Sequence, residues 1–98
     1  MAAWVYILKC ADGSYYTGVT TDLDERMEQH ARGELAEYTS TRRPVQLLWT
    51  NEFQDINEAR AFETRVKKWS RAKKEALMRG DFDALPALSA RGYRPAKR

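Results

Sequence analysis

Residues 4–20 read WVYILKCADGSYYTGVT, and this stretch decides the fold of the chain. Its two halves are rich in β-branched and aromatic residues, and Asp12-Gly13 between them is a turn signal, so it predicts a β-hairpin. A two-residue loop at this turn places Tyr6 and Tyr16 on opposite faces of the sheet, because side chains alternate along a strand. A three-residue loop, with Gly13 as the left-handed residue of a bulge, places both tyrosines on one face. The sequence fits either register.

Capping signals beyond the hairpin predict where two helices begin. Thr21 is the expected N-cap of the first helix, with Asp24 in its first turn and Gly33 at its end. Asp55 followed by Glu58 marks the start of the second helix in the same way. A polar loop and a third strand are expected between these two helices.

A third helix is expected directly after the second. The expected inward positions are Ala59, Phe62, Val66 and Trp69 in the second helix, and Ala72, Ala76 and Leu77 in the third, which begins at Ser70 and ends at Gly80. The expected strands are residues 4–10, 15–20 and 45–53. These elements predict an α+β fold in the order β-β-α-β-α-α.

At 98 residues the chain has room for one domain. We expect this domain to span residues 1–85 and a basic tail to follow at 86–98. No apolar run reaches the ~20 residues needed to span a bilayer, which favours a soluble, cytoplasmic protein. Cys10 lies in an apolar strand pattern and is expected to be a buried structural thiol.

The net charge of +3 hides an asymmetry between two parts of the chain. Residues 1–40 carry seven acidic and three basic side chains, whereas residues 41–98 carry seven acidic and fourteen basic ones. Residues 65–74, here called the basic stripe, contain no acid and surround Trp69. Such a stripe can bind nucleic-acid phosphates while the tryptophan stacks on a base, or it can be a solvated helix face with the tryptophan turned inward. Its cations are Arg65, Lys67, Lys68, Arg71, Lys73 and Lys74.

Side chains suited to phosphodiester hydrolysis are spread along the chain. Tyr6 and Tyr16 supply hydroxyl groups, and Glu63 supplies a carboxylate of the kind that Mg²⁺ accepts. Arg26 can bond two phosphate oxygens at once, and His30 lies four residues later on the same face of the expected helix. Taken singly, each residue is also explained by packing or by exposure on the surface.

The order of these residues is more informative than any one of them. The series runs Val5-Tyr6, Tyr16-Thr17-Gly18, Thr21-Asp22-Leu23, Arg26, His30, Glu63, and then Lys67, Lys68, Trp69 and Lys73-Lys74. It resembles the GIY-YIG nuclease family, in particular its short stand-alone bacterial proteins. The resemblance covers residues 4 to about 80.

The resemblance implies a three-stranded antiparallel sheet flanked by helices, with a site on one sheet face that cleaves nucleic acid with one divalent metal. It implies Tyr16 as the general base or the group that positions water, and Tyr6 as the tyrosine of the first motif. Arg26 would stabilise the phosphate in the transition state, and Glu63 would hold Mg²⁺ or Mn²⁺. His30 would assist proton transfer or orient Tyr6.

Some motif positions differ from the family pattern. Trp4 stands in place of the first motif's glycine, Thr17 in place of the second motif's isoleucine, and no asparagine follows Glu63. Gly18 matches the glycine of the second motif, where it would let a substrate backbone come close.

The function implied is metal-dependent hydrolysis of nucleic-acid phosphodiesters, with DNA as the expected substrate and DNA repair as an expected role. Because the chain has no room for a separate targeting domain, substrate preference would come from the basic stripe, a protein partner or DNA shape. The alternative is a nucleic-acid-binding or interaction module on the same fold with weak or no catalytic activity.

Overall fold

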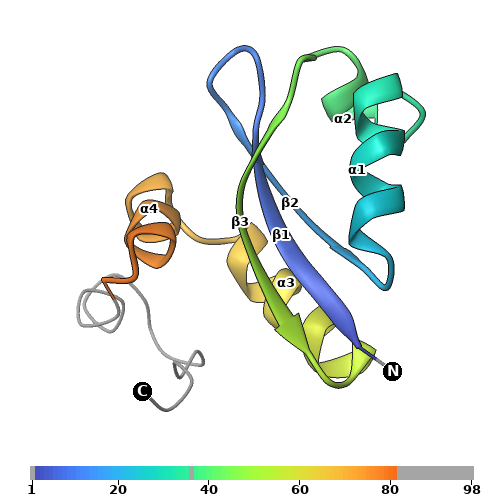
Figure 1. The fold of residues 1–98 in the computed structure, drawn as a ribbon. Coiled ribbons are helices and arrows are strands. Elements are labelled where there is room, and N and C mark those ends of the chain that lie inside the picture. The colour runs from blue at the N-terminus through green and yellow to red at the C-terminus, as the bar shows by residue number, and fades with distance from the viewer. Residues whose placement is uncertain (1, 36, 82–98) are drawn as a thin grey trace.

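The computed structural model describes residues 2–35 and 37–81. Its sheet contains the strands β1 (Ala3–Lys9), β2 (Tyr15–Thr20) and β3 (Gln46–Phe53). The strands are antiparallel and lie in the order β2-β1-β3, so β2 is an edge strand. The α+β class and the antiparallel three-stranded sheet are therefore confirmed (Figure 1).

The hairpin adopts the three-residue register. The backbone N–H of Cys10 donates to the carbonyl of Ser14 at 2.8 Å, and Gly13 between them has a φ of 88°, as a G1 bulge requires. The same register pairs Leu8 with Tyr16 and Tyr6 with Gly18. Both tyrosines therefore lie on one face of the sheet.

Within residues 2–35 and 37–81 four helices accompany the sheet, one more than the sequence predicts there. They are α1 (Leu23–Arg32), α2 (Glu37–Ser40), α3 (Ile56–Lys67) and α4 (Arg71–Arg79). The unexpected α2 is a single turn inside the segment expected to be a polar loop.

The predicted caps are correct for α3 and α4 and wrong by one residue for α1. Asp55 and Ser70 cap α3 and α4 as expected, with side chains that accept from backbone N–H groups in the first turn. In α1 the cap is Asp22, whose carboxylate accepts from the N–H of Glu25, and not Thr21. A carboxylate at this position also meets the positive end of the helix dipole.

The hydrophobic core lies on one face of the sheet, against α3 and α4. Figure 1 shows α4 on the opposite side of the sheet from α1 and α2. The core residues are Ala3, Val5, Ile7, Ala59, Phe62, Val66, Ala76 and Leu77. Cys10 is buried, which confirms the expectation for its thiol.

Of the expected inward positions in the basic helices, Trp69 is confirmed and Ala72 is wrong. Trp69 packs against the core with its ring edge-on to Phe62, so the inward reading of this residue is correct. Ala72 is exposed, and its neighbour Lys73 takes the inward position in its place.

The expected tail at 86–98 and the last residues of the expected domain lie outside the described residues. In the part of the chain that is described, no helix is long and apolar enough to cross a membrane.

Candidate functional site

The face of the sheet opposite the core holds a buried hydrogen-bonded chain. The Tyr6 hydroxyl lies 2.8 Å from His30 Nε2, and His30 Nδ1 lies 3.1 Å from Thr39 Oγ1. These residues come from β1, α1 and α2, and all three side chains are buried. The short helix α2 is therefore tied to the sheet through the imidazole.

Tyr16 contacts the same imidazole from β2. Its ring and the ring of His30 meet edge to face with centroids 5.5 Å apart, and Tyr6 meets His30 in a similar way at 5.6 Å. The structure therefore brings Tyr6, Tyr16 and His30 together, as the series of motifs led us to expect.

Arg26 lies next to this cluster, one helical turn before His30. Its guanidinium lowers the pKa of Tyr6 by a hydrogen bond and by its charge, and its Nη1 lies 3.5 Å from the carbonyl oxygen of Val19. No carboxylate forms an ion pair with Arg26 among residues 2–35 and 37–81. A guanidinium without an acidic partner can accept a phosphate.

The surroundings hold both titratable groups of the cluster in the neutral form. Burial raises the pKa of Tyr6 to about 12, helped by Tyr16 and by the charge of Glu63, against the opposing effect of Arg26. Burial, followed by the charge of Arg26, lowers the pKa of His30 below its usual 6.5. At pH 7 the site therefore contains a protonated phenol and a neutral imidazole.

Gly18 gives Tyr6 its space. It lies directly opposite Tyr6 in the strand register, and a Cβ atom there would overlap the Tyr6 hydroxyl and Cζ. The expectation that Gly18 admits a substrate backbone is replaced by this internal role, because the space is filled by the phenol.

Glu63 approaches from the other layer. It lies on α3, which packs under the core face and also contacts β2. The carboxylate is largely covered, with 13% of the side chain exposed, and it pairs with Lys67 Nζ at 2.8 Å. Its charge raises the pKa of Tyr6, and its carboxylate contacts the Lys67 ammonium.

A groove joins the two layers along the free edge of β2. Its volume is about 380 Å³. Three consecutive strand residues line it, and since side chains alternate between faces, a groove that touches all three must follow the strand edge. Lys67 lines it too and links it to Glu63. The lining residues are Tyr15, Tyr16, Thr17, Tyr38, Lys67 and Lys74.

A metal ion at Glu63 fits the donor chemistry of this edge. The carboxylate already binds one cation, the Lys67 ammonium, whose side chain is 53% exposed and can turn into solvent. Among the described residues no three His, Cys, Asp or Glu side chains cluster as metal ligands. A single carboxylate suits Mg²⁺, which keeps most of its waters.

The basic stripe does not act as one surface. Lys73 is 2% exposed and its Nζ lies 3.6 Å from the ring centre of Trp69, so its predicted place in a nucleic-acid surface is wrong. Arg71 covers the Tyr15 ring at 4.1 Å and pairs with Glu75. The remaining cations, Arg65, Lys67, Lys68 and Lys74, are exposed or half-buried.

Three residues near the site were missed by sequence reasoning. Tyr38 stacks on Tyr16 with centroids 6.1 Å apart and planes 21° apart, and Arg42 lies 3.9 Å over the Tyr38 ring. Thr39 is the buried partner of His30. The one signal in the sequence was Tyr38 itself, an aromatic residue at the start of a segment that is otherwise polar.

The sequence matches the profile of the GIY-YIG catalytic domain over residues 2–76. The UPF0213 protein of Halalkalibacterium halodurans is 50% identical over 78 residues, which are 80% of this chain and 83% of that protein. A UPF0213 protein of Halobacterium salinarum is 49% identical over 73 residues, 74% of this chain and 95% of the relative. These relatives are thus of similar length to the matched region.

Two solved structures have the same fold. The solution NMR structure of the UPF0213 protein from Bacillus halodurans has a TM-score of 0.53 and 51% identity, and covers 79% of this chain and 82% of its own. The solution NMR structure of the protein EF2693 from E. faecalis has a TM-score of 0.56 and 30% identity, with 97% and 96% covered.

Proposed function

The chain belongs to the GIY-YIG family, and we propose that it is a nuclease that hydrolyses nucleic-acid phosphodiester bonds, with DNA as its expected substrate. The observation that carries the proposal is the convergence of Tyr6 and Tyr16 on one neutral imidazole, beside Arg26, which has no acidic partner among the described residues. Hydrolysis needs a positioned water, a proton acceptor and a cation for the phosphate, and this cluster offers all three.

Each residue has a distinct task in the proposed reaction. The Tyr16 hydroxyl positions the attacking water, whose oxygen forms a bond to phosphorus while the bond to the leaving sugar oxygen breaks. Arg26 offsets the charge that grows on the phosphate oxygens. The proton of the water passes to the Tyr16 hydroxyl, which gives its own proton to solvent, while the buried Tyr6–His30 pair holds the Tyr16 ring; the leaving oxygen takes a proton from solvent.

Glu63 is the residue proposed to hold a divalent cation. When bound, such a cation would further neutralise the phosphate and polarise its oxygens. Lys67 must leave the carboxylate for this to occur, and its exposed side chain permits that. The Lys67–Glu63 pair is also the observation that favours the second candidate, a binding module in which the pair stays closed and the site has no turnover.

Cleavage assays separate the two candidates. Purified protein is incubated with single-stranded, branched and duplex DNA, and with RNA, in Mg²⁺ or Mn²⁺. We expect metal-dependent cleavage that falls at least 100-fold in Tyr16→Phe and Glu63→Ala, as is typical when a catalytic group is removed.

A control variant and a folding measurement distinguish loss of catalysis from loss of folding. Glu58→Ala removes an exposed acid from the same helix as Glu63 and should keep full activity. Circular dichroism should show all variants folded. If no substrate is cut with either metal, the binding-module reading replaces the nuclease.

A further inference from the structure

Tyr38 has a surface that the proposed reaction does not use. It lies on α2 and is 38% exposed; with Leu47 at 40%, it is one of two large apolar side chains that the described residues leave open to solvent. Leu47 lies on β3, away from the groove, whereas Tyr38 lines the groove at the site. An aromatic side chain that lines a groove beside the proposed site is placed to contact a ligand there.

The Tyr38 ring is held in place before any ligand binds. One contact is the stack on Tyr16, and the second is the Arg42 guanidinium over the ring. Arg42 is itself fixed by Asp12, 2.9 Å from its Nε. The side chain of Arg42 is 36% exposed and can turn into solvent, so that a base takes its place over a ring that Tyr16 keeps in position; such a ring loses little conformational entropy when the base binds.

The rest of the groove suits a nucleotide. Lys67 and Lys74 line it and offer positive charge for phosphate. Thr17 also lines it, and its Oγ1 is buried without a hydrogen-bond partner in the described part of the chain. A buried hydroxyl without a partner is costly, so a polar group on a ligand would be favoured there once the edge of β2 shifts enough to admit it.

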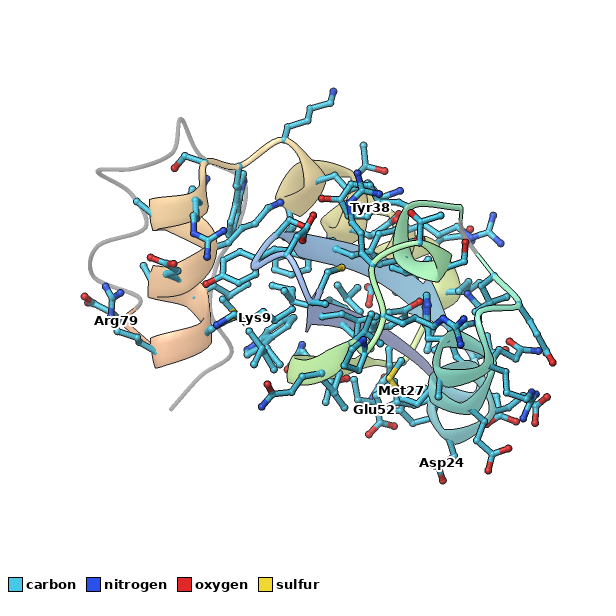
Figure 2. The ribbon with its side chains drawn as sticks, turned by 90° about the horizontal axis from the view of Figure 1, so that it is seen from above. Lys9, Asp24, Met27, Tyr38, Glu52 and Arg79 are labelled. Atoms are coloured by element: carbon cyan, nitrogen blue, oxygen red, sulfur yellow. The ribbon has the colours of Figure 1, made fainter. Side chains whose placement is uncertain are left out.

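Negative charge on α1, on the far side of the site, determines from which side a nucleic-acid strand can approach. The exposed side of α1 carries Asp24, Glu25 and Glu28, which repel a polyanion. Figure 2 shows Asp24 well apart from Tyr38. A strand would therefore reach the cluster from the lysines of α3 and α4, across Tyr38.

We propose that this groove binds an unpaired nucleotide next to the phosphate that is cleaved, with its base in contact with the Tyr38 ring. In a duplex the faces of each base are covered by its neighbours, so only a base that has left the stack can make this contact. The inference rests on the proposed function and names its substrate class: single-stranded nucleic acid, or a duplex with an unpaired segment at the cleavage site.

The test measures binding without turnover. The Glu63→Ala protein in EDTA is titrated into a 12-nucleotide single-stranded DNA that contains 2-aminopurine, and into the blunt duplex of the same sequence. We expect the fluorescence of the single strand to be quenched by stacking, and Tyr38→Ala in that background to weaken its binding roughly tenfold, within the usual effect of one base–aromatic stack. Duplex binding should be weaker and should not change with Tyr38→Ala.

Three variants make the result specific. Tyr38→Phe and Tyr38→Trp keep the ring and should restore both affinity and quenching, whereas Leu47→Ala, an equally exposed apolar residue elsewhere, should change neither. Equal affinity of Tyr38→Ala and its parent for the single strand would overturn the proposal. Since the assay needs neither metal nor cleavage, an absent nuclease activity would leave its outcome intact, and a failed stacking test would leave the nuclease standing.

Discussion

Tyr6 is the residue whose surroundings make the clearest prediction. Its pKa of about 12 in the folded chain lies above the usual 10, so folding favours the protonated phenol by roughly 3 kcal/mol. Because the folded-state pKa is the higher one, this contribution is complete below pH 10 and disappears as the pH rises toward 12. The free energy of unfolding of the native protein should fall by roughly this amount across that interval.

The variant Tyr6→Phe isolates this effect. At pH 8 it should be less stable by about 1–3 kcal/mol, because His30 Nε2 loses its buried hydrogen-bond partner. Above pH 10 its stability should fall less than that of the native protein, since the titrating group is gone. Urea unfolding at pH 8, 10, 11 and 12 measures both; parallel pH curves for the two proteins would contradict the assignment.

Residue identity and spacing were enough to foresee part of this cluster. The alternation of β-strands and the left-handed glycine of the turn allowed the two tyrosines to share a face, and the i, i+4 spacing placed Arg26 and His30 together. Thr39 and Tyr38 could not be foreseen, because their contacts depend on how a short segment folds back over the sheet. Such long-range placement leaves no periodic signal.

At the scale of elements, α4 gives two neighbouring lysines, Lys73 and Lys74, different surroundings. Lys73 is covered and lies over Trp69, whereas Lys74 is half-buried and lines the groove. We expect Lys73→Ala to lower the free energy of unfolding by about 1–2 kcal/mol, since it removes a desolvated cation–π contact and its packing.

Lys74→Ala should have the opposite profile. Its unfolding free energy should stay within about 0.5 kcal/mol of the native value, while its affinity for a single-stranded oligonucleotide should drop. Thermal melts and fluorescence anisotropy on the two variants measure both quantities. Equal losses of stability in the two proteins would show that the helix is rotated from the position described.

Prediction of helices from the sequence succeeded for long segments with clear caps. It failed where the inward face or the existence of a helix depends on how it packs against the rest of the protein. The apolar spacing of α3 fixed its inward face correctly, because several positions agree. In α4 the expected inward face was wrong at Ala72. The rotation of a short helix about its own axis depends on what the helix packs against, and here it turns the next residue inward instead. Helix α2 is too short to have a periodicity of its own.

At the scale of the whole molecule, the two charge regions lie on different sides of the sheet. The acidic helix α1 and the basic helix α4 flank it on opposite sides in Figure 1, and Asp24 and Arg79 mark the two ends in Figure 2. The edge of β2, with Tyr16 exposed to the groove, lies between them. A polyanion at this edge is thus attracted on one side and repelled on the other, which orients it.

This arrangement predicts a shallow salt dependence of binding. With Arg65, Lys67, Lys68 and Lys74 as the remaining cations of the basic stripe, log affinity for single-stranded DNA should fall against log salt with a slope of about −2.8, a loss of roughly 50-fold between 50 and 200 mM. Lys74→Ala should reduce the slope by about 0.7, whereas Arg32→Ala on the acidic helix, where Arg32 pairs with Glu34, should leave it unchanged. Anisotropy titrations at four salt concentrations give the slopes. An equal change from both variants would mean that the strand crosses α1 as well, and that the charge asymmetry does not orient it.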